Sequence, residues 1–472
     1  MDTESIWDLS ATELGRLIKT RELSPVEIVN SLFSRIDAFE EVINSFICLF
    51  REAALTQARQ AEQEIAAGRW RGPLHGVPYA VKDIIDVAGV ATTAGSNVWK
   101  GFVAEKDAAV VSHLKNSGAI LIGKLNMHEL AFGITSRNPH FGNIKNPWDL
   151  TSSSGGSSGG SAAALAAGFV PLTLGTDTGG SIRIPSSKCG VVGLKPTYGL
   201  VSTEGVLPLA WSLDHVGPLG RSVEDLAIAL SVIAPTYRDG SGNDSLPLND
   251  STIETKGLVI GVPGTFFYED LREDVQQTVL AAVHKFELLG AEIREIEIPD
   301  IVAADMAAFT ILFSEAAACL EYHVREHPLR LGAEIMENLK LGMTIPATRY
   351  IQAMRTRNKV AHDMKKIFSE VDVLAVPATC VDTFPINALE VEIRKDLIVD
   401  VRTATTRNMR FFNLAGNPVL SLPCGFSKNN LPVGMQLVGE AFAERKLLAV
   451  GSAYQKAFPL QPMMPELEML IG

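Results

Sequence analysis

The sequence is poor in cysteine and in metal-ligand motifs. Its 472 residues include five cysteines, an odd number, and none stands in a CxxC or CxxH spacing. A disulfide framework and a structural zinc site are therefore not indicated. His128 and Glu129 are adjacent in NMHEL, but the second histidine of the HExxH zinc motif is missing, which excludes a metalloprotease of that type. We expect no metal and no other cofactor.

The sequence also lacks a basic tract, a signal peptide and a long apolar run. The net charge of −12 argues against nucleic acid or an anionic membrane as the partner. The N-terminal MDTESIWDLSATEL is acidic and has no apolar signal region, and no run of apolar residues approaches the length that spans a bilayer. These features predict a soluble cytoplasmic protein.

The order of the expected elements indicates an α/β fold. Two capping boxes, SATE and SPVE, open a helical arm or outer layer over residues 1–70. Strand-like and helix-like segments alternate over residues 71–472, which predicts one continuous core with helices on both faces of a sheet. Residues 234–255, rich in Pro, Gly, Ser, Asn and Asp, are expected to form an exposed loop.

Two glycine-flanked serine clusters are the most informative feature that is present. The first, GGSSGG, precedes an alanine-rich helix former, and the second, GTDTGGS, follows the strand-like PLTL. Small side chains let consecutive backbone N–H groups converge on an oxyanion, and the candidates in the second cluster are Thr178, Gly179, Gly180 and Ser181. The GxSxG pattern of the first cluster does not indicate an α/β-hydrolase nucleophile elbow, because polar NPWDLTSSS precedes it instead of a buried strand. Neither cluster matches a Walker loop or the GxGxxG dinucleotide motif.

A lysine is the candidate general base. None of the nine histidines stands in a spacing that links it to an aspartate and a serine, so a hydrolase with this sequence needs another base. Lys82 ends the apolar, strand-like segment YAVK, where burial would lower its pKa. The alternative interpretation is a lysine that reaches solvent or pairs with Asp83 or Asp86.

Six segments, in this order along the chain, form a pattern that is specific to one family. They are HGVPYAVKD, GKLNMHELAFG, GGSSGGSAAALAAG, GTDTGGSIRIPSSKCGVVGLKPTYG, LDHVGP and NLAGNPVLSLPCG. On these segments the chain closely resembles the amidase signature family of serine hydrolases. The resemblance implies an α/β fold with one large mixed, mostly parallel twisted sheet. It also implies a Ser/cis-Ser/Lys triad, in which Ser181 is the nucleophile, Ser157 follows a cis peptide bond and bridges, and Lys82 is the terminal base. Such a site cleaves carboxylic amide C–N bonds through an acyl-enzyme.

Residues beside the triad have two interpretations. Ser158 is a secondary candidate for the relay, because it adjoins Ser157. Asp177 and Arg183 flank the nucleophile, where an auxiliary role competes with a structural ion pair or loop anchor.

Substrate selection is assigned to a variable segment over about residues 300–360. Phe309 and Tyr350 of this segment, together with Met127, are candidates to contact substrate, and core packing is the alternative for them. We expect a small apolar or aryl amide, with carbamate or urea-type bonds as further options. The helical arm favours a homodimer.

Three other functions are weighed against an amidase. The A subunit of the glutamyl-tRNA amidotransferase releases ammonia from glutamine and works with partner subunits, and Arg357 resembles the arginine that such subunits use on the glutamine carboxylate. The segment RTATTRNMRFF before NLAG, however, lacks the carboxylate expected to bind the glutamine amino group. An esterase and a non-catalytic scaffold are the other two alternatives, and a scaffold would be expected to lose triad members.

Overall fold

The computed structural model describes residues 3–235, 255–461 and 464–470, so most of the expected loop, 236–254, lies outside the described residues. The N-terminal layer contains η1 (Thr3–Asp8), α1 (Ala11–Thr20), α2 (Pro25–Ile43) and α3 (Arg51–Ala66). Both predicted capping boxes are present, at the start of α1 and of α2. The arm also holds β1 (Phe46–Leu49), which the sequence patterns do not indicate and which pairs with β3 at one edge of the main sheet.

One eleven-stranded sheet of the described residues organises the core, in the order β1-β3-β2-β6-β8-β7-β14-β15-β11-β9-β10. The other ten strands are β2 (Pro78–Lys82), β3 (Ile120–Leu125), β6 (Leu172–Asp177), β7 (Val192–Lys195), β8 (His215–Gly220), β9 (Val259–Pro263), β10 (Glu292–Ile296), β11 (Val373–Pro377), β14 (Val419–Phe426) and β15 (Pro432–Val438). The sheet is mixed, as predicted. Parallel pairing is confined to β3-β2-β6 and β11-β9-β10, and the centre from β6 to β11 is antiparallel. The expectation of a mostly parallel sheet is therefore wrong for the centre, where each of the strands β8, β7, β14 and β15 runs antiparallel to both of its neighbours.

Helices cover both faces of this sheet. One group is α5 (Gly159–Ala166) and α6 (Arg183–Cys189), which contact each other and strands from β2 to β15. The other group packs on β7, β8 and the strands from β14 to β10 and comprises α7 (Val223–Ile233), α8 (Glu273–Leu288) and α14 (Glu444–Ala457), and α4 (Ala109–Asn116) packs against α7. Three apolar clusters of buried residues pack the described structure, and all eight residues of α5 are buried.

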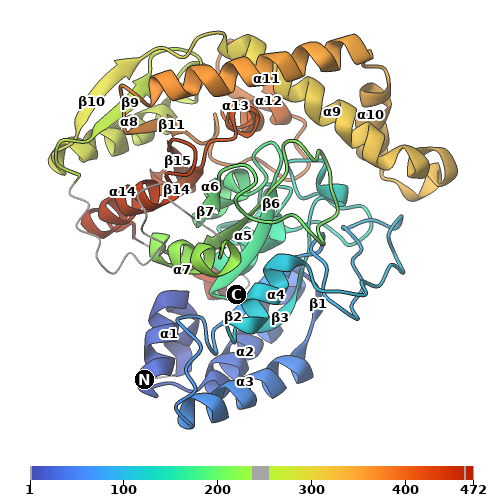
Figure 1. Cartoon of the computed structure of the whole chain (residues 1–472), viewed down its shortest axis with the longest axis vertical. Coiled ribbons are helices and arrows are strands. Elements are labelled where there is room, and N and C mark those ends of the chain that lie inside the picture. Colours follow the sequence, from blue (N-terminus) through green and yellow to red (C-terminus); the bar gives the residue numbers. More distant parts are fainter. Residues whose placement is uncertain (1–2, 236–254, 462–463, 471–472) are drawn as a thin grey trace.

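A second helical layer lies at the end of the molecule opposite α1–α3 (Figure 1). It consists of α9 (Ile301–Glu326), α10 (Ala333–Met343) and α11 (Ala347–Ile367), so the segment assigned to substrate selection is helical as expected. The short helices α12 (Val401–Thr406) and α13 (Arg410–Ala415) lie beneath it, and α13 contacts both α9 and α11. The remaining described elements are η2 (Glu129–Ala131), β4 (Lys145–Asn146), β5 (Asp149–Ser153), η4 (Pro328–Arg330), β12 (Glu390–Arg394), β13 (Leu397–Asp400) and α15 (Leu467–Leu470).

Helix α9 corrects one sequence expectation. By length and composition alone it is apolar enough to cross a membrane, although no run of that kind is expected from the sequence. Of its most apolar stretch, 56% is buried inside the protein. Because α9 packs against α10, α11 and α13, its apolar character is that of a core helix in this fold.

Candidate active site

Lys82 occupies the carboxyl end of β2, between β3 and β6. Its side chain is fully buried, and Nζ lies 2.7 Å from Ser157 Oγ and 2.8 Å from Thr176 Oγ1. The neighbouring Asp83 is paired with Lys124, whose Nζ is 2.8 Å from Asp83 Oδ1. Lys82 therefore neither reaches solvent nor pairs with Asp83, and its hydrogen bonds go to two hydroxyl groups.

The environment of Lys82 favours the neutral amine. Burial lowers the pKa of Lys82 to about 7, although the carboxylates of Asp177 and Asp214 act in the opposite direction. A buried ammonium that has only neutral hydrogen-bond partners loses hydration without gaining a full counter-charge. About half of the molecules then carry a neutral amine at pH 7. Lys82 is thus able to accept a proton under neutral conditions.

The two adjacent serines of GGSSGG face different ways. The Gly156–Ser157 peptide bond is cis, and Ser157 Oγ points to Lys82. Ser158 Oγ instead donates to the Thr176 carbonyl at 3.2 Å and accepts from the Thr176 N–H at 3.3 Å, which fastens the start of α5 to β6. The hydroxyl of the secondary candidate Ser158 is therefore bonded to the backbone of Thr176, and among the described residues it has no hydrogen bond to Lys82 or Ser157. Its N–H donates to the Ser181 carbonyl at 3.2 Å and links the two serine clusters.

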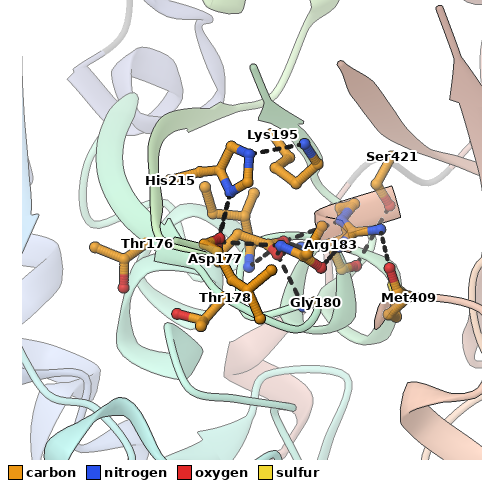
Figure 2. Close-up of polar contacts among 12 residues, drawn as sticks. Thr176, Asp177, Thr178, Gly180, Arg183, Lys195, His215, Met409 and Ser421 are labelled. Carbon is orange, nitrogen blue, oxygen red and sulfur yellow. Dashed lines mark hydrogen bonds and ion pairs between the residues drawn. The ribbon is translucent and has the colours of Figure 1, made fainter. Parts of the chain in front are cut away.

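The loop that carries Ser181 is folded around Asp177 (Figure 2). The Asp177 carboxylate accepts from the backbone N–H of Gly180 at 2.8 Å and of Ile182 at 3.1 Å. This corrects one oxyanion candidate, because the Gly180 N–H is already donated inside the loop. For the N–H groups of Thr178, Gly179 and Ser181, the described residues supply no acceptor. The Thr178 hydroxyl donates to Asp214 at 2.6 Å and holds the first part of the loop.

Arg183 completes the support of this loop. Its Nε and Nη2 each lie 3.0 Å from an oxygen of Asp177, and both side chains are fully buried. Arg183 also donates to Gln436 at 2.8 Å and to Asn413 at 2.7 Å. Burial opposes the charge of Asp177, but the positive charge of Arg183 and the hydrogen bonds that Arg183 and Asn413 donate to the carboxylate hold the pKa of Asp177 below the ordinary range. Of the two interpretations of Asp177 and Arg183, the structure supports the loop anchor.

Lys195 and His215 form a second set of polar contacts with this loop, at the backbone of Asp177. His215 Nδ1 lies 3.1 Å from the Asp177 carbonyl oxygen, and His215 Nε2 lies 3.2 Å from Lys195 Nζ (Figure 2). Burial lowers the pKa of both His215 and Lys195 well below their ordinary values. Both ends of Asp177, backbone and carboxylate, are therefore fixed by buried hydrogen bonds.

Ser181 opens onto a cavity that brings together residues from distant parts of the chain. The cavity is lined by Ala131, Phe132, Gly133, Ile134, Thr178, Gly179, Ser181, Leu209, Leu312, Phe313, Arg402, Thr406 and Arg410. Its walls are thus mostly apolar, with the glycine-rich loop and two guanidinium groups as polar components. A larger surface cavity of about 1150 Å³ lies elsewhere, between residues 268–277 and 392–395, and contains no triad residue.

Two of the predicted substrate residues, Met127 and Phe309, do not line this cavity themselves. Met127 is fully buried and belongs to the main apolar cluster, so it packs the core and does not line the cavity. Phe309 stacks on Phe313 with ring centroids 4.0 Å apart, and Phe313 lines the cavity. Phe309 therefore supports the cavity wall from behind.

The other two lie outside the lining of the cavity. Tyr350 Oη donates to the buried Glu315 at 2.8 Å. The guanidinium of Arg357 lies 4.9 Å from the centre of the Tyr198 ring. Neither Tyr350 nor Arg357 is among the described residues that line the cavity, and a contact of either with substrate stays a prediction.

Four residues of the site have no signal in the sequence patterns. Thr176 is the second hydroxyl partner of Lys82, and it stands as an ordinary strand threonine in PLTLGTD. Arg402, Thr406 and Arg410 come from the segment before NLAG, which is notable in the sequence only for the carboxylate it lacks. Arg402 and Arg410 are two of the three arginines of RTATTRNMR, and only the fold brings them beside Ser181.

The groups gathered here are those that nucleophilic acyl transfer uses. They are a lysine with a near-neutral pKa, a serine bonded to it, and a second serine on a loop with unpaired N–H groups. The sequence profile of the Amidase family matches residues 27–448, so the chain belongs to the Amidase family. It is an amide-hydrolysing enzyme of the amidase signature type.

Known proteins of this family align over nearly the whole chain. The A subunit of glutamyl-tRNA(Gln) amidotransferase from Geobacter sp. (strain M21) is 37% identical over 479 residues, covering 96% of this chain and 97% of that protein. An amidase of Pseudomonas putida is 39% identical over 484 residues, covering 98% of this chain and 99% of that protein. A crystal structure of an amidase superposes with a TM-score of 0.88 at 35% identity, covering 95% of this chain and 99% of that chain.

Proposed function

We propose that the protein hydrolyses small amides through an acyl-enzyme on Ser181, with Ser157 as the bridging acid and base and Lys82 as the terminal base. The observation that carries the proposal is the fully buried Lys82, with a pKa of about 7, whose Nζ is 2.7 Å from Ser157 Oγ. A serine hydroxyl is a weak nucleophile unless a base removes its proton as it attacks. Lys82 supplies that base through Ser157.

The chemistry proceeds in two halves. In the first half, the Ser181 hydroxyl attacks the amide carbonyl, its proton passes to Ser157, and the Ser157 proton passes to Lys82. The oxyanion accepts from the N–H groups of Thr178, Gly179 and Ser181, each worth about 2.7–4 kcal/mol to the transition state in comparable sites. The tetrahedral intermediate then collapses as Ser157 protonates the leaving amine, and in the second half water attacks the acyl ester by the same relay.

The apolar cavity walls support an acyl or aryl portion of modest size. Phe132, Leu312 and Phe313 are positioned to pack against such a group. The same oxyanion site accepts carbamate, urea-type and ester carbonyls, so these bonds belong in the substrate panel. The Gly/Ser loop and the triad candidates argue against a non-catalytic scaffold.

A glutaminase subunit of a tRNA-dependent amidotransferase is the second candidate, because relatives of that name align over 96–97% of the chain at 37–38% identity. Two observations favour the amidase. Arg357 stacks on Tyr198, outside the lining of the cavity, and no Asp or Glu is among the described residues that line it. A glutamine ammonium would therefore lack a counter-charge there.

Hydrolysis assays separate these functions. Wild type should release ammonia from aliphatic amides or aniline from aryl acylamides without a partner subunit, and Ser181→Ala and Lys82→Ala should lose this activity. Ser158→Ala serves as the matched control, because its hydroxyl is bonded to Thr176. Turnover that survives in Ser181→Ala refutes the proposed nucleophile. Ammonia release from glutamine alone points to the amidotransferase subunit.

We further infer that the protein acts in the cytoplasm. All five cysteines are free, which fits a reducing compartment. Homodimer formation through the helical arm stays a prediction, and light scattering on the purified protein tests it directly.

A further inference from the structure

Two arginines line the same cavity as Ser181. Arg402 comes from α12 and Arg410 from the first residue of α13, and Thr406 lies between them at the cavity wall. The other components of the wall are apolar residues and the glycine-rich loop. Because a guanidinium group in a mostly apolar cavity needs a counter-charge, the question is which carboxylate pairs with each of these two arginines.

Arg410 is already neutralised. Its Nε and Nη2 lie 2.9 Å and 2.7 Å from the two oxygens of Asp305, a bidentate pair between α13 and α9. Both side chains are largely buried, at 17% and 14% exposed. Such a fork-on-carboxylate pair satisfies both charges and fixes the geometry of Arg410. Arg410 therefore shapes the cavity but does not need an anion.

Arg402 is only partly compensated. Its Nη2 lies 3.4 Å from Glu334 Oε1 and 3.2 Å from Asn338 Oδ1, and the described residues supply no hydrogen-bond partner for its Nε or Nη1. Glu334 is shared, because Arg137 Nη2 is 3.4 Å from its other oxygen. The Glu334 carboxylate thus accepts from two guanidinium groups, and the Nε and Nη1 donors of Arg402 have no acceptor among the described residues.

Charged and aromatic groups surround the Arg402 guanidinium. Burial lowers the pKa of Arg402 and the neighbouring Arg410 adds to this shift, while the carboxylates of Glu334 and Asp400 act against it. The guanidinium lies 5.9 Å from the centre of the Phe313 ring, so an apolar group beside Phe313 and an anion on Arg402 occupy the same cavity. Guanidinium donors that are held in place and lack an acceptor are suited to a carboxylate, which matches their planar fork.

We propose that the substrate is a small amide that also bears a carboxylate, and that Arg402 binds this carboxylate in the cavity beside Ser181. This inference rests on the proposed function. It refines the apolar amide expected above, because the hydrocarbon part of the substrate, between its carboxylate and its amide, would still pack against the apolar side chains of the cavity. It also distinguishes a monoanion from a zwitterionic amino acid, since no Asp or Glu among the described residues lines the cavity to receive an ammonium.

The test compares matched pairs of amides by ammonia release. Malonamate, succinamate and glutaramate carry the carboxylate, and acetoacetamide, 4-oxopentanamide and 5-oxohexanamide are their neutral counterparts of the same length. In wild type, the best pair should favour the anion by about 10- to 100-fold in kcat/KM, the range of a charge-assisted hydrogen bond. Glutaramate should also exceed glutamine, which differs from it by the ammonium group.

Three variants then assign the preference to Arg402. Arg402→Met should bring the ratio of anion to neutral kcat/KM close to one by lowering the value for the anion only. Glu334→Gln should raise the ratio, because it removes the carboxylate that competes for Nη2. Arg137→Met should lower the ratio without bringing it to one, because Glu334 then serves Arg402 alone while Arg137 itself does not line the cavity.

The proposal is overturned if wild type hydrolyses the neutral amides as well as the anions, or if Arg402→Met keeps the full preference. If Arg402→Met folds poorly, the Glu334→Gln variant decides the question. A higher ratio of anion to neutral kcat/KM in Glu334→Gln supports the role of Arg402, and an unchanged or lower ratio refutes it. Failure of the proposed function looks different. In that case no amide of either kind is hydrolysed, and a fluorophosphonate does not label Ser181.

Discussion

The acylation of Ser181 should depend on pH through the burial of Lys82. A lysine at the ordinary pKa of 10.5 is almost entirely charged at neutral pH, whereas Lys82 has a pKa of about 7. At pH 7 the shift raises the neutral fraction from about one in three thousand to about one half, a roughly thousandfold gain. Because only the neutral amine accepts a proton, the rate should rise with pH and level off above the pKa of the folded protein.

The assay is the second-order rate of fluorophosphonate labelling between pH 5 and pH 9.5, followed by intact-protein mass spectrometry. This reagent modifies the nucleophile without requiring the natural substrate. The wild-type rate should be about one tenth of its plateau at pH 6 and about nine tenths at pH 8. In Lys82→Ala, the rate should fall by roughly 10²- to 10⁴-fold and the inflection should disappear.

Thr176 provides a sharper version of this test. Its hydroxyl oxygen lies 2.8 Å from Lys82 Nζ and accepts a hydrogen bond that stabilises the charged ammonium. Thr176→Val should therefore lower the pKa of Lys82 further and move the inflection to lower pH. The reasoning is refuted if the wild-type rate rises without a break toward pH 9.5, or if Lys82→Ala keeps the inflection near pH 7.

Four further substitutions test the geometry around Ser181. Ser157→Ala should lower kcat/KM by about 10²- to 10⁴-fold and Ser158→Ala by less than about tenfold, so equal losses contradict the assignment of the relay. Asp177→Asn should destabilise the protein by about 3–5 kcal/mol in urea unfolding, because Arg183 stays buried without its counter-charge. An unchanged unfolding midpoint argues against that anchor. Gly180→Ala should reduce labelling of Ser181 by more than about tenfold, because φ is +119° and a Cβ would lie 2.8 Å from Met409. Full labelling of this variant contradicts a tightly held loop.

Local signals in the sequence carry much of the fold. The capping boxes at Ser10 and Ser24 depend on residues three positions apart, and both are present. The segment YAVK forms most of β2 with Lys82 at its end, and the last three residues of PLTL begin β6. The antiparallel centre of the sheet is not predictable in this way. Strand direction there depends on how distant segments pair, for example β7 with β14, and no short pattern records it.

In the candidate site, too, some residues are predictable from local sequence patterns and others depend on the fold. Glycine-flanked serines and a strand-end lysine are visible as residue types in a pattern, so Lys82, Ser157 and Ser181 are all candidates from sequence. Which of two adjacent serines faces the lysine is a matter of backbone direction, and the structure turns Ser158 toward Thr176 instead. The positive charge at the cavity is likewise a product of the fold, because Arg402 is separated from Ser181 by more than two hundred residues of sequence.

The central claim is that Ser181 is the nucleophile, and locating a covalent adduct tests it most directly. Wild type and Ser181→Ala would be treated with a fluorophosphonate, digested and sequenced by tandem mass spectrometry. The structure predicts one adduct, on Ser181 in the segment TGGSIR, and none in Ser181→Ala. An adduct on Ser157 or another serine, or amide hydrolysis by wild type that persists in Ser181→Ala, would contradict it.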